Sequence, residues 1–289
     1  MRVGKQQELY PYSASVDRPK NTWREGVRLA IVVMPNLEHF EVNNSAGKLD
    51  VKSFAVGDYG NRVGWWRMLE IFDRLGVVAS VAINSSVCEH YPRIVESCLE
   101  RNYEFLGHGI TNSEDLDELD EAEAAEAVRL SLEVIRSTTR RPVRGWLGTG
   151  LAERDGTLAS LKQCDVEYVC EWGLSDDQPF TLNNGIVAMP YSLELNDRRY
   201  FSGGGTGAGF FQGICDAFDV LYDEGAEQLR VLCLSLHPFL IGAPSRIRYL
   251  SEALEYMARH DGVWWAQCSE VLDAYMSMEV NPLSVKGVS

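Results

Sequence analysis

The chain has 289 residues, of which 42 are acidic and 27 basic, so its formal net charge at pH 7 is −15. An acidic surface of this kind repels nucleic acid and anionic membranes, and we expect neither as a partner. The seven cysteines never form a C-x-x-C pair, which argues against a disulfide framework and a zinc knuckle and favours a reducing, cytoplasmic setting.

The N-terminal segment is polar and shows no hydrophobic period, so we expect an arm over residues 1–26. This segment lacks the apolar stretch of an export signal, and no later run reaches the roughly 20 apolar residues that a membrane span needs. We expect a single domain over residues 27–280, followed by a C-terminal tail at 281–289.

From residue 28 onward, short apolar runs alternate with amphipathic segments. The runs that predict strands lie at 28–34, 77–83, 104–108, 143–147, 166–170, 186–190, 230–236 and 262–266. Helical periodicity covers 63–75, 91–101, 121–137, 155–163, 209–224, 246–259 and 268–279. Such alternation indicates parallel β–α units, and seven or eight of them favour a barrel over a doubly wound sheet.

One glycine-rich stretch, residues 202–209 (SGGGTGAG), has the composition of a loop. It lacks the G-x-G-x-x-G spacing and does not follow a strand, so dinucleotide binding is not expected. We interpret it as loop slack, with a lid or an acyl-group contact as the alternative.

Polar side chains follow several predicted strands at their carboxyl ends, where the active sites of parallel barrels form. Asn36 and Glu38 follow the first strand and, two positions apart, can point the same way. His108 ends the third strand, Asn112 comes four residues later, and His237 follows the strand at 230–236. These residues are the main candidates for a shared site.

Two further strand ends carry candidate substrate contacts. Trp146 lies in the fourth predicted strand and would offer an apolar wall, and Glu171 follows the fifth. Each polar residue alone also fits a structural role, such as a hydrogen-bonded core histidine or a cap. Their joint occurrence at several strand ends favours the functional interpretation.

Five motifs, in this order and spacing, resemble the NodB-type polysaccharide deacetylase family over roughly residues 28–278. They are Asn36/Glu38, His108-Gly109-x-x-Asn112, Pro142…Gly145-Trp146, Asp176-Asp177-Gln178-Pro179-Phe180 and Leu236-His237-Pro238. The resemblance implies a distorted (β/α)7 barrel that hydrolyses C–N bonds other than peptide bonds, with Asp177 as a further substrate contact. The motifs are most similar to the branch that holds the metal-independent allantoinases and the intracellular deacetylase homologues.

The resemblance also implies where a metal would bind. Metal-dependent members have two aspartates in the first motif and two histidines in the second, whereas this chain has Asn36, Glu38, His108 and Asn112. An amide cannot act as a general base, and its oxygen is a poor replacement for imidazole at a zinc site. We therefore expect no cofactor and no tightly bound metal. If a divalent ion such as zinc binds, the ligands would be Glu38, His108 and Asn112.

Hydrolysis of an amide-like C–N bond needs a base for water, a stabiliser of the oxyanion and an acid for the leaving nitrogen. We assign Glu38 as the base and His237 as the acid. His108 and the amides of Asn36 and Asn112 would orient substrate or water.

The predicted function is metal-independent hydrolysis of a small amide, ureide or cyclic imide, so the expected partner is a small molecule. Two alternatives stay open: a catalytically silent barrel that binds a small ligand or a partner protein, and a metal-dependent sugar de-N-acetylase. The sequence also leaves a homo-oligomer open.

Overall fold

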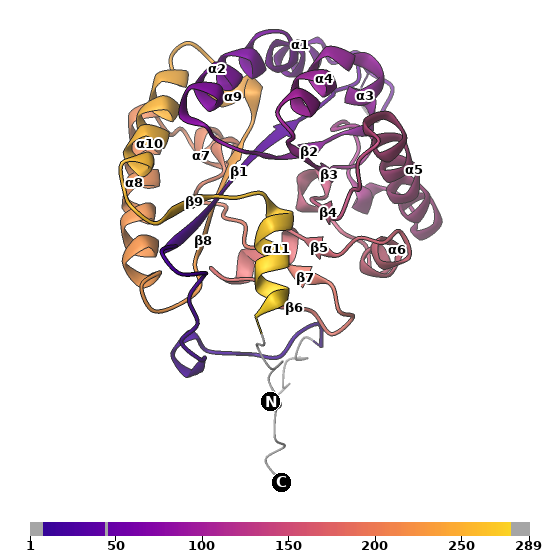
Figure 1. Cartoon of the computed structure of the whole chain (residues 1–289). Coiled ribbons are helices and arrows are strands. Elements are labelled where there is room, and N and C mark those ends of the chain that lie inside the picture. The colour runs from indigo at the N-terminus through magenta and orange to yellow at the C-terminus, as the bar shows by residue number, and fades with distance from the viewer. Residues whose placement is uncertain (1–7, 44–45, 279–289) are drawn as a thin grey trace, which may run out of the picture.

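The computed structural model describes residues 8–43 and 46–278 (Figure 1). Within this part of the chain, nine strands form one sheet in the order β6-β7-β5-β4-β3-β2-β1-β8, and β9 also pairs with β1. The strands are β1 (Leu29–Leu37), β2 (Ser80–Ile83), β3 (Glu104–Gly107), β4 (Gly145–Trp146), β5 (Tyr168–Val169), β6 (Phe180–Thr181), β7 (Val187–Ala188), β8 (Val231–Leu236) and β9 (Val263–Trp265).

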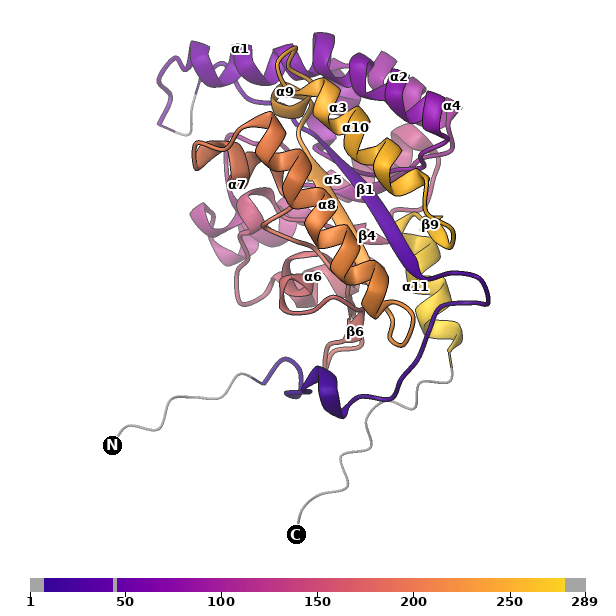
Figure 2. The ribbon, with the colours of Figure 1, turned by 90° about the vertical axis from the view of Figure 1, so that its left-hand side faces the viewer.

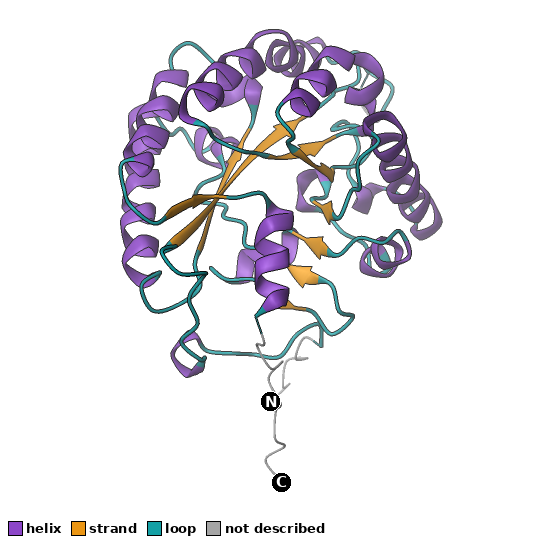
Figure 3. Ribbon diagram, viewed as in Figure 1, coloured by secondary structure: helices purple, strands orange, loops and turns teal. Residues whose placement is uncertain are grey.

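Helices cover the outer face of this curled sheet, as Figure 3 shows. The α-helices are α1 (Val51–Tyr59), α2 (Trp65–Leu75), α3 (Ser85–His90), α4 (Pro92–Glu100), α5 (Glu121–Thr139), α6 (Thr157–Gln163), α7 (Asp197–Ser202), α8 (Gly207–Glu224), α9 (Pro238–Ile241), α10 (Ile247–Ala258) and α11 (Cys268–Ser277). A π-helical turn, η2 (Gly60–Gly64), joins α1 to α2, and short 3-10 helices are η1 (Ser15–Asp17), η3 (Leu116–Glu118), η4 (Thr149–Leu151) and η5 (Glu171–Ser175).

The sheet is a distorted, incompletely closed barrel. All its ladders are parallel except that of β6 with β7. Irregular segments approach the outer edge of β8: the Val231 N–H donates to Asp177 O at 2.9 Å and the Ser235 N–H to Leu195 O at 3.2 Å. The predicted α/β barrel is confirmed.

Two apolar layers hold the barrel together. On β1, Ile31 and Val33 belong to the layer between sheet and helices, whereas Val32 and Met34 belong to the layer inside the curl. Because side chains alternate along a strand, the inner row of β1 continues into Asn36 and then Glu38. The alternation of side chains along β1 therefore places Asn36 and Glu38 inside the barrel at the carboxyl end of this strand.

Several short elements differ from the sequence expectation. The structure adds β6, α3, α7 and α9, which are too short to show a period in sequence, and α1, whose apolar residues form no buried stripe. The stretch 202–209 is not all loop, because α8 already begins at Gly207. Thr206 caps this helix by accepting a hydrogen bond from the Gly209 N–H at 3.1 Å.

The N-terminal segment lies at the end of the barrel where the strands begin. Residues 8–26 contain one 3-10 turn and otherwise no helix or strand. Within this segment, Arg18 pairs with Asp176 at 2.6 Å, and the Trp23 indole N–H donates to Arg230 O at 2.9 Å, just before β8. Figure 2 shows this segment below the barrel, far from α1 and α9. Residues 1–7 of the predicted arm and the predicted tail at 281–289 lie outside the described residues.

Candidate active site

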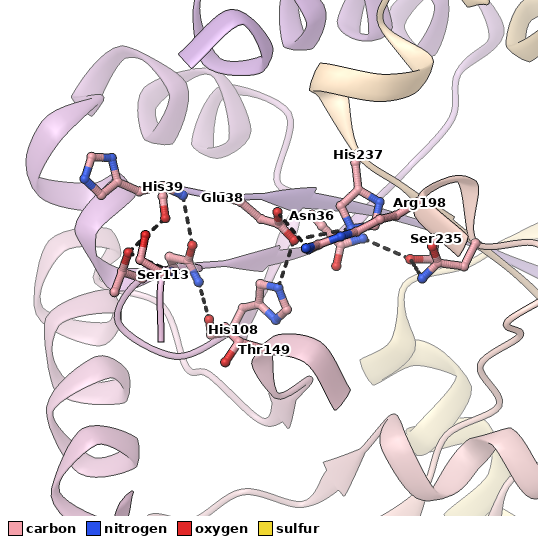
Figure 4. A network of polar contacts seen from close by, with 12 residues as sticks. Asn36, Glu38, His39, His108, Ser113, Thr149, Arg198, Ser235 and His237 are labelled. Atoms are coloured by element: carbon pink, nitrogen blue, oxygen red, sulfur yellow. Dashed lines mark hydrogen bonds and ion pairs between the residues drawn. The ribbon is translucent and has the colours of Figure 1, made fainter. Parts of the chain in front are cut away.

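Glu38 is the centre of a buried polar cluster at the carboxyl ends of the strands (Figure 4). It directly follows β1, and its Oε1 lies 3.3 Å from Nε2 of His108 and 3.3 Å from Nε2 of His237. His108 directly follows β3 and His237 directly follows β8, and each continues the inner row of its strand. The structure therefore brings together the three residues that the sequence predicted as catalytic.

Asp197, in the first turn of α7, holds His237 in place. Its Oδ1 lies 2.6 Å from Nδ1 of His237, and its two oxygens also accept the backbone N–H groups of His237 and Ile241 at 3.0–3.2 Å. Burial favours the neutral ring, but the charges of Glu38 and Asp197 and the hydrogen bonds to them outweigh it and raise the pKa of His237 to about 9. The ring is therefore protonated at neutral pH.

The same ion pair sets the charge of Glu38. Burial opposes ionisation, but the charge of His237 and hydrogen bonds from His108 and His237 hold the pKa of Glu38 well below its usual range. Its Oε2 is buried and has no hydrogen-bond partner among the described residues. Glu38 is thus an ionised carboxylate with one oxygen engaged and one left available.

The loop after β4 fixes the orientation of His108. The Nδ1 atom of His108 lies 2.5 Å from the carbonyl oxygen of Leu147. Because a carbonyl oxygen can only accept a hydrogen bond, Nδ1 carries a ring proton. Nε2 can then donate to Glu38 only when the ring holds both protons, and in the neutral ring it is an acceptor. The side chain of Asn84 also donates to His108 O.

Asn36 lies beneath this cluster in a second buried network. Its side-chain N–H groups donate to Met34 O at 3.2 Å and to Ser235 Oγ at 3.0 Å. Ser235 also contacts the hydroxyl of Tyr191 at 2.5 Å and the amide of Asn196 at 3.3 Å. Both amide protons of Asn36 are used in these bonds, so only its carbonyl oxygen remains to face water or substrate.

Three residues of the site were missed in the sequence: Asp197, Arg198 and Asn61. Arg198 follows Asp197 on α7, and its guanidinium lies 3.7 Å from Glu38 Oε2. Asn61 lies in the π-helical turn η2 and donates to Glu38 O at 2.9 Å. Such turns often occur at functional sites. The polar run Asn-Asp-Arg-Arg at 196–199 was the available signal for the first two.

Two predicted contacts, Asn112 and Trp146, are not joined to Glu38 by any hydrogen bond within the described chain. The Asn112 N–H donates to His39 O at 2.8 Å, and its buried Oδ1 has no partner among those residues. Trp146 faces outward from β4: a Cβ on Gly107 would lie 2.6 Å from its ring and 2.8 Å from Leu132 of α5. The indole thus packs toward the helices.

Glu171 lies at the same end of the barrel, but it binds the backbone of the loop after β4 and not Glu38. Its Oε1 accepts the Gly148 N–H, and its buried Oε2 has no partner in the described structure. Burial and the charge of Glu153 raise the pKa of Glu171 to about 8, against the hydrogen bond from Gly148. Through Gly148, Glu171 supports the neighbouring carbonyl of Leu147 that orients His108.

Asp177 lies far from Glu38. Its carbonyl accepts the N–H of Val231, the first residue of β8, whereas His237 follows the last. Six residues at about 3.3 Å each separate the two ends by roughly 20 Å. Asp177 is exposed and lines a cavity of about 480 Å³ between α8 and β8. The predicted substrate contacts at Asp177, Trp146 and Asn112 stay predictions that this geometry does not support.

The arrangement of these side chains does not match that of a catalytic metal centre. The described residues contain no group of three or more His, Cys, Asp or Glu side chains arranged to hold a metal ion. Both imidazoles point at one oxygen of Glu38, so the three side chains contact one another and do not surround a common position for an ion.

No helix in residues 8–43 and 46–278 combines the length and the apolar composition that crossing a membrane requires.

Comparisons with known proteins place the chain among similar folds. No family model matches it. A curated protein of Schizosaccharomyces pombe named "Putative polysaccharide deacetylase" is 27% identical over 246 residues, or 75% of this chain and 74% of that protein. The crystal structure of Puue allantoinase is 25% identical with a TM-score of 0.85, covering 96% of this chain and 99% of its own. That of a probable polysaccharide deacetylase from Pseudomonas aeruginosa is 25% identical with a TM-score of 0.84, covering 93% and 99%.

Proposed function

The chain belongs to the NodB-type polysaccharide deacetylase family and is a hydrolase of C–N bonds other than peptide bonds, and we propose that it cleaves a small amide, ureide or cyclic imide without a metal ion. One observation carries the proposal. Glu38 is a buried carboxylate with Oε1 between two imidazoles and Oε2 free of hydrogen bonds to the described residues.

Glu38 activates the attacking water in this proposal. The water donates one proton toward Oε2, and its oxygen forms a bond to the substrate carbonyl carbon, giving a tetrahedral oxyanion. His108, with Nε2 at 3.3 Å from Glu38 Oε1 and Nδ1 against Leu147 O, holds the carboxylate so that Oε2 can receive this proton. The carbonyl oxygen of Asn36 is the remaining acceptor below the site.

His237 protonates the leaving nitrogen. The C–N bond breaks as its electron pair takes the Nε2 proton, so the products are a carboxylic or carbamic acid and an amine or amide. A low pKa alone would make Glu38 a weak base. However, the positive charge that lowers this pKa is that of His237, so loss of the His237 proton strengthens Glu38 as a base. The two proton transfers therefore favour each other.

A metal ion has no assigned role in this scheme. The amides of Asn36 and Asn112 stand where the metal-dependent relatives are expected to have a base and a ligand, and the histidines and Glu38 are not positioned around a common ion in the described residues. The similar structures bear the names allantoinase and polysaccharide deacetylase, which supports ureides and N-acyl compounds as first substrates to test.

The cellular compartment and the partners are also part of the proposal. We place the enzyme in the cytoplasm, acting on a small molecule and not on nucleic acid or a membrane. Its seven cysteines are unpaired and six of them are buried, which suits a reducing compartment. The sequence and the fold leave a homo-oligomer open.

A substrate screen tests the proposed function. Purified protein would be incubated with ureides, cyclic imides and N-acyl compounds, and the released amine, ammonia or acid measured by NMR. We expect at least one compound to be hydrolysed and the activity to disappear in Glu38→Gln. Binding without turnover of any compound would support a silent barrel, and activity that appears only with added zinc would support a metal-dependent deacetylase.

A further inference from the structure

Arg198 is the cationic side chain that reaches the candidate catalytic carboxylate from α7. Figure 4 shows it extending from the helix toward Glu38 beside His237. NH1 lies 3.7 Å from Glu38 Oε2, and 47% of the side chain is exposed. The guanidinium thus has one side toward the buried oxygen that we assign to water and another toward solvent.

The guanidinium of Arg198 is poorly satisfied compared with other arginines of the chain. Arg144 donates to two carboxylates with four bonds of 2.7–3.2 Å, and Arg101 holds Asp73 with two bonds of 2.6 Å. Arg198 donates no hydrogen bond to any residue that the structure describes. Five N–H donors in a planar fork are therefore available beside Glu38 Oε2.

The neighbouring acidic groups already have other partners. Glu38 Oε1 lies 3.3 Å from Nε2 of His237 and 3.3 Å from Nε2 of His108. Burial raises the pKa of Asp115, and the side chain of Thr149 opposes this shift more than the charge of Arg198 does. Arg198 is therefore not needed as their counter-ion.

We infer that Arg198 binds a carboxylate group of the substrate, so that the enzyme acts on amides, ureides or imides that carry a carboxylate close to the cleaved C–N bond. A planar guanidinium fork matches a carboxylate with two parallel hydrogen bonds. The chain's net charge of −15 would otherwise repel an anionic substrate, so a local cation is required to admit one. This inference rests on the proposed function and names its substrate class.

Matched substrate pairs test the inference. Each N-carbamoyl or N-acyl amino acid would be compared with its own C-terminal primary amide, which removes only the negative charge. Wild type should prefer the acid in kcat/KM, and Arg198→Gln should lower kcat/KM for the acid by roughly 10- to 100-fold, mainly through KM, because a charge-assisted pair is lost. The neutral amide should change by less than about threefold, the size of a weak or absent hydrogen bond.

Arg62→Gln is the matched control. Arg62 lies in η2, its side chain is 75% exposed, and it pairs only loosely with Asp58 at 3.6 Å, so the variant removes the same charge away from Glu38. It should leave the preference for the acid intact. Arg198→Lys, which keeps the charge but not the fork, should restore part of the preference.

Several results would overturn the inference. An equal fall in kcat for acid and amide would make Arg198 an oxyanion stabiliser, and a wild-type preference for the amide would contradict an anionic substrate. If no compound is turned over, the proposed function fails, but calorimetric titration of the acids still decides the inference. Binding that is lost in Arg198→Gln supports it, and absent or unchanged binding refutes it.

Discussion

Glu38 and His237 form an ion pair that is almost fully excluded from solvent, with 3.3 Å between the carboxylate Oε1 and the imidazole Nε2. Each group stabilises the charged form of the other, and Asp197 adds a second negative charge behind the ring at 2.6 Å. Removing one member of such a pair leaves a buried charge without a partner. This lowers the free energy of unfolding by more than the intact pair adds to it. The pair is therefore both the proposed proton-transfer unit and a point of structural sensitivity.

Glu38→Gln should lower turnover by roughly 10²- to 10⁴-fold, the range typical of losing a general base, because the amide cannot accept a proton from water. The pKa of His237 should fall at the same time, since its main counter-charge is removed. Steady-state kinetics and an NMR titration of the ring measure the two effects. Glu41→Gln, at a half-exposed position, is the control and should retain turnover. Near-normal turnover in Glu38→Gln would assign the base to another residue.

The activity should depend on pH through the same pair. Turnover should hold across neutral pH and fall as pH rises through about 9, where His237 loses the proton that it gives to the leaving nitrogen. It should also fall in strong acid, where Glu38 becomes protonated. Asp197→Asn removes one charge that raises the pKa of His237, so the alkaline limb should move to lower pH. An unmoved alkaline limb in that variant would show that His237 does not cause it.

Stability should follow a related profile. The folded protein holds the His237 proton more tightly than the unfolded chain, so this contribution is complete below pH 6.5 and is lost as pH rises to about 9. The lowered pKa of Glu38 contributes stability above pH 4.5 that is lost as pH falls. The pair therefore stabilises most between pH 4.5 and 6.5, which urea unfolding at several pH values can check. A pair contribution that increases from pH 6.5 to 9 would contradict the assignment.

Chelator treatment should leave the activity of the purified protein nearly unchanged, because the cluster around Glu38 is not arranged as a metal-ligand set in the described chain. Elemental analysis before treatment should show no stoichiometric divalent ion. Dialysis against a strong chelator, followed by assays with and without added zinc, measures this. Activity that is lost on chelation and regained with zinc would overturn the metal-independent scheme.

The positions of Glu38, His108 and His237 could be predicted because each comes directly after a strand whose apolar period is readable. The parallel arrangement then places all three at one end of the barrel.

Trp146 shows the limit of this reasoning. Its strand, β4, is only two residues long, and an error of one position moves a side chain to the other face of the sheet. The neighbouring Leu147 carries the inward position.

Asp197, Arg198 and Asn61 could not be placed from sequence for a different reason. Each lies on a short helix or a π-helical turn that leaves no period. Its contact with Glu38 or His237 depends on how α7 and η2 pack against β8 and α9. The distance of Asp177 from Glu38 could not be foreseen either, because its segment turns back to the beginning of β8. Such long-range packing has no local signal in one sequence.

Glu171→Gln should make stability less dependent on pH. The buried carboxyl group of Glu171 holds its proton up to a pKa of about 8, so folding binds a proton between pH 4.5 and 8 and wild-type stability falls over that window. Glutamine can still accept the Gly148 N–H but cannot ionise. The variant should therefore gain relative to wild type as pH rises, by up to a few kcal/mol. Parallel unfolding curves at pH 5 and pH 8.5 would contradict the buried, protonated state of Glu171.

Gly64→Ala should displace the backbone that carries His237, although Gly64 is not part of the site. Gly64 ends the π-helical turn η2, and a Cβ there would lie 2.0 Å from the carbonyl oxygen of Pro238, immediately after His237. Because this neighbour is backbone, the chain around His237 must shift. We expect a lower melting temperature together with lower turnover.

Gly213 of α8 is the matched control, because a Cβ there meets no atom within 4 Å. Gly213→Ala should keep turnover and stabilise the helix by up to about 1 kcal/mol. Equal effects of the two substitutions would mean that the close approach of η2 to Pro238 does not position His237.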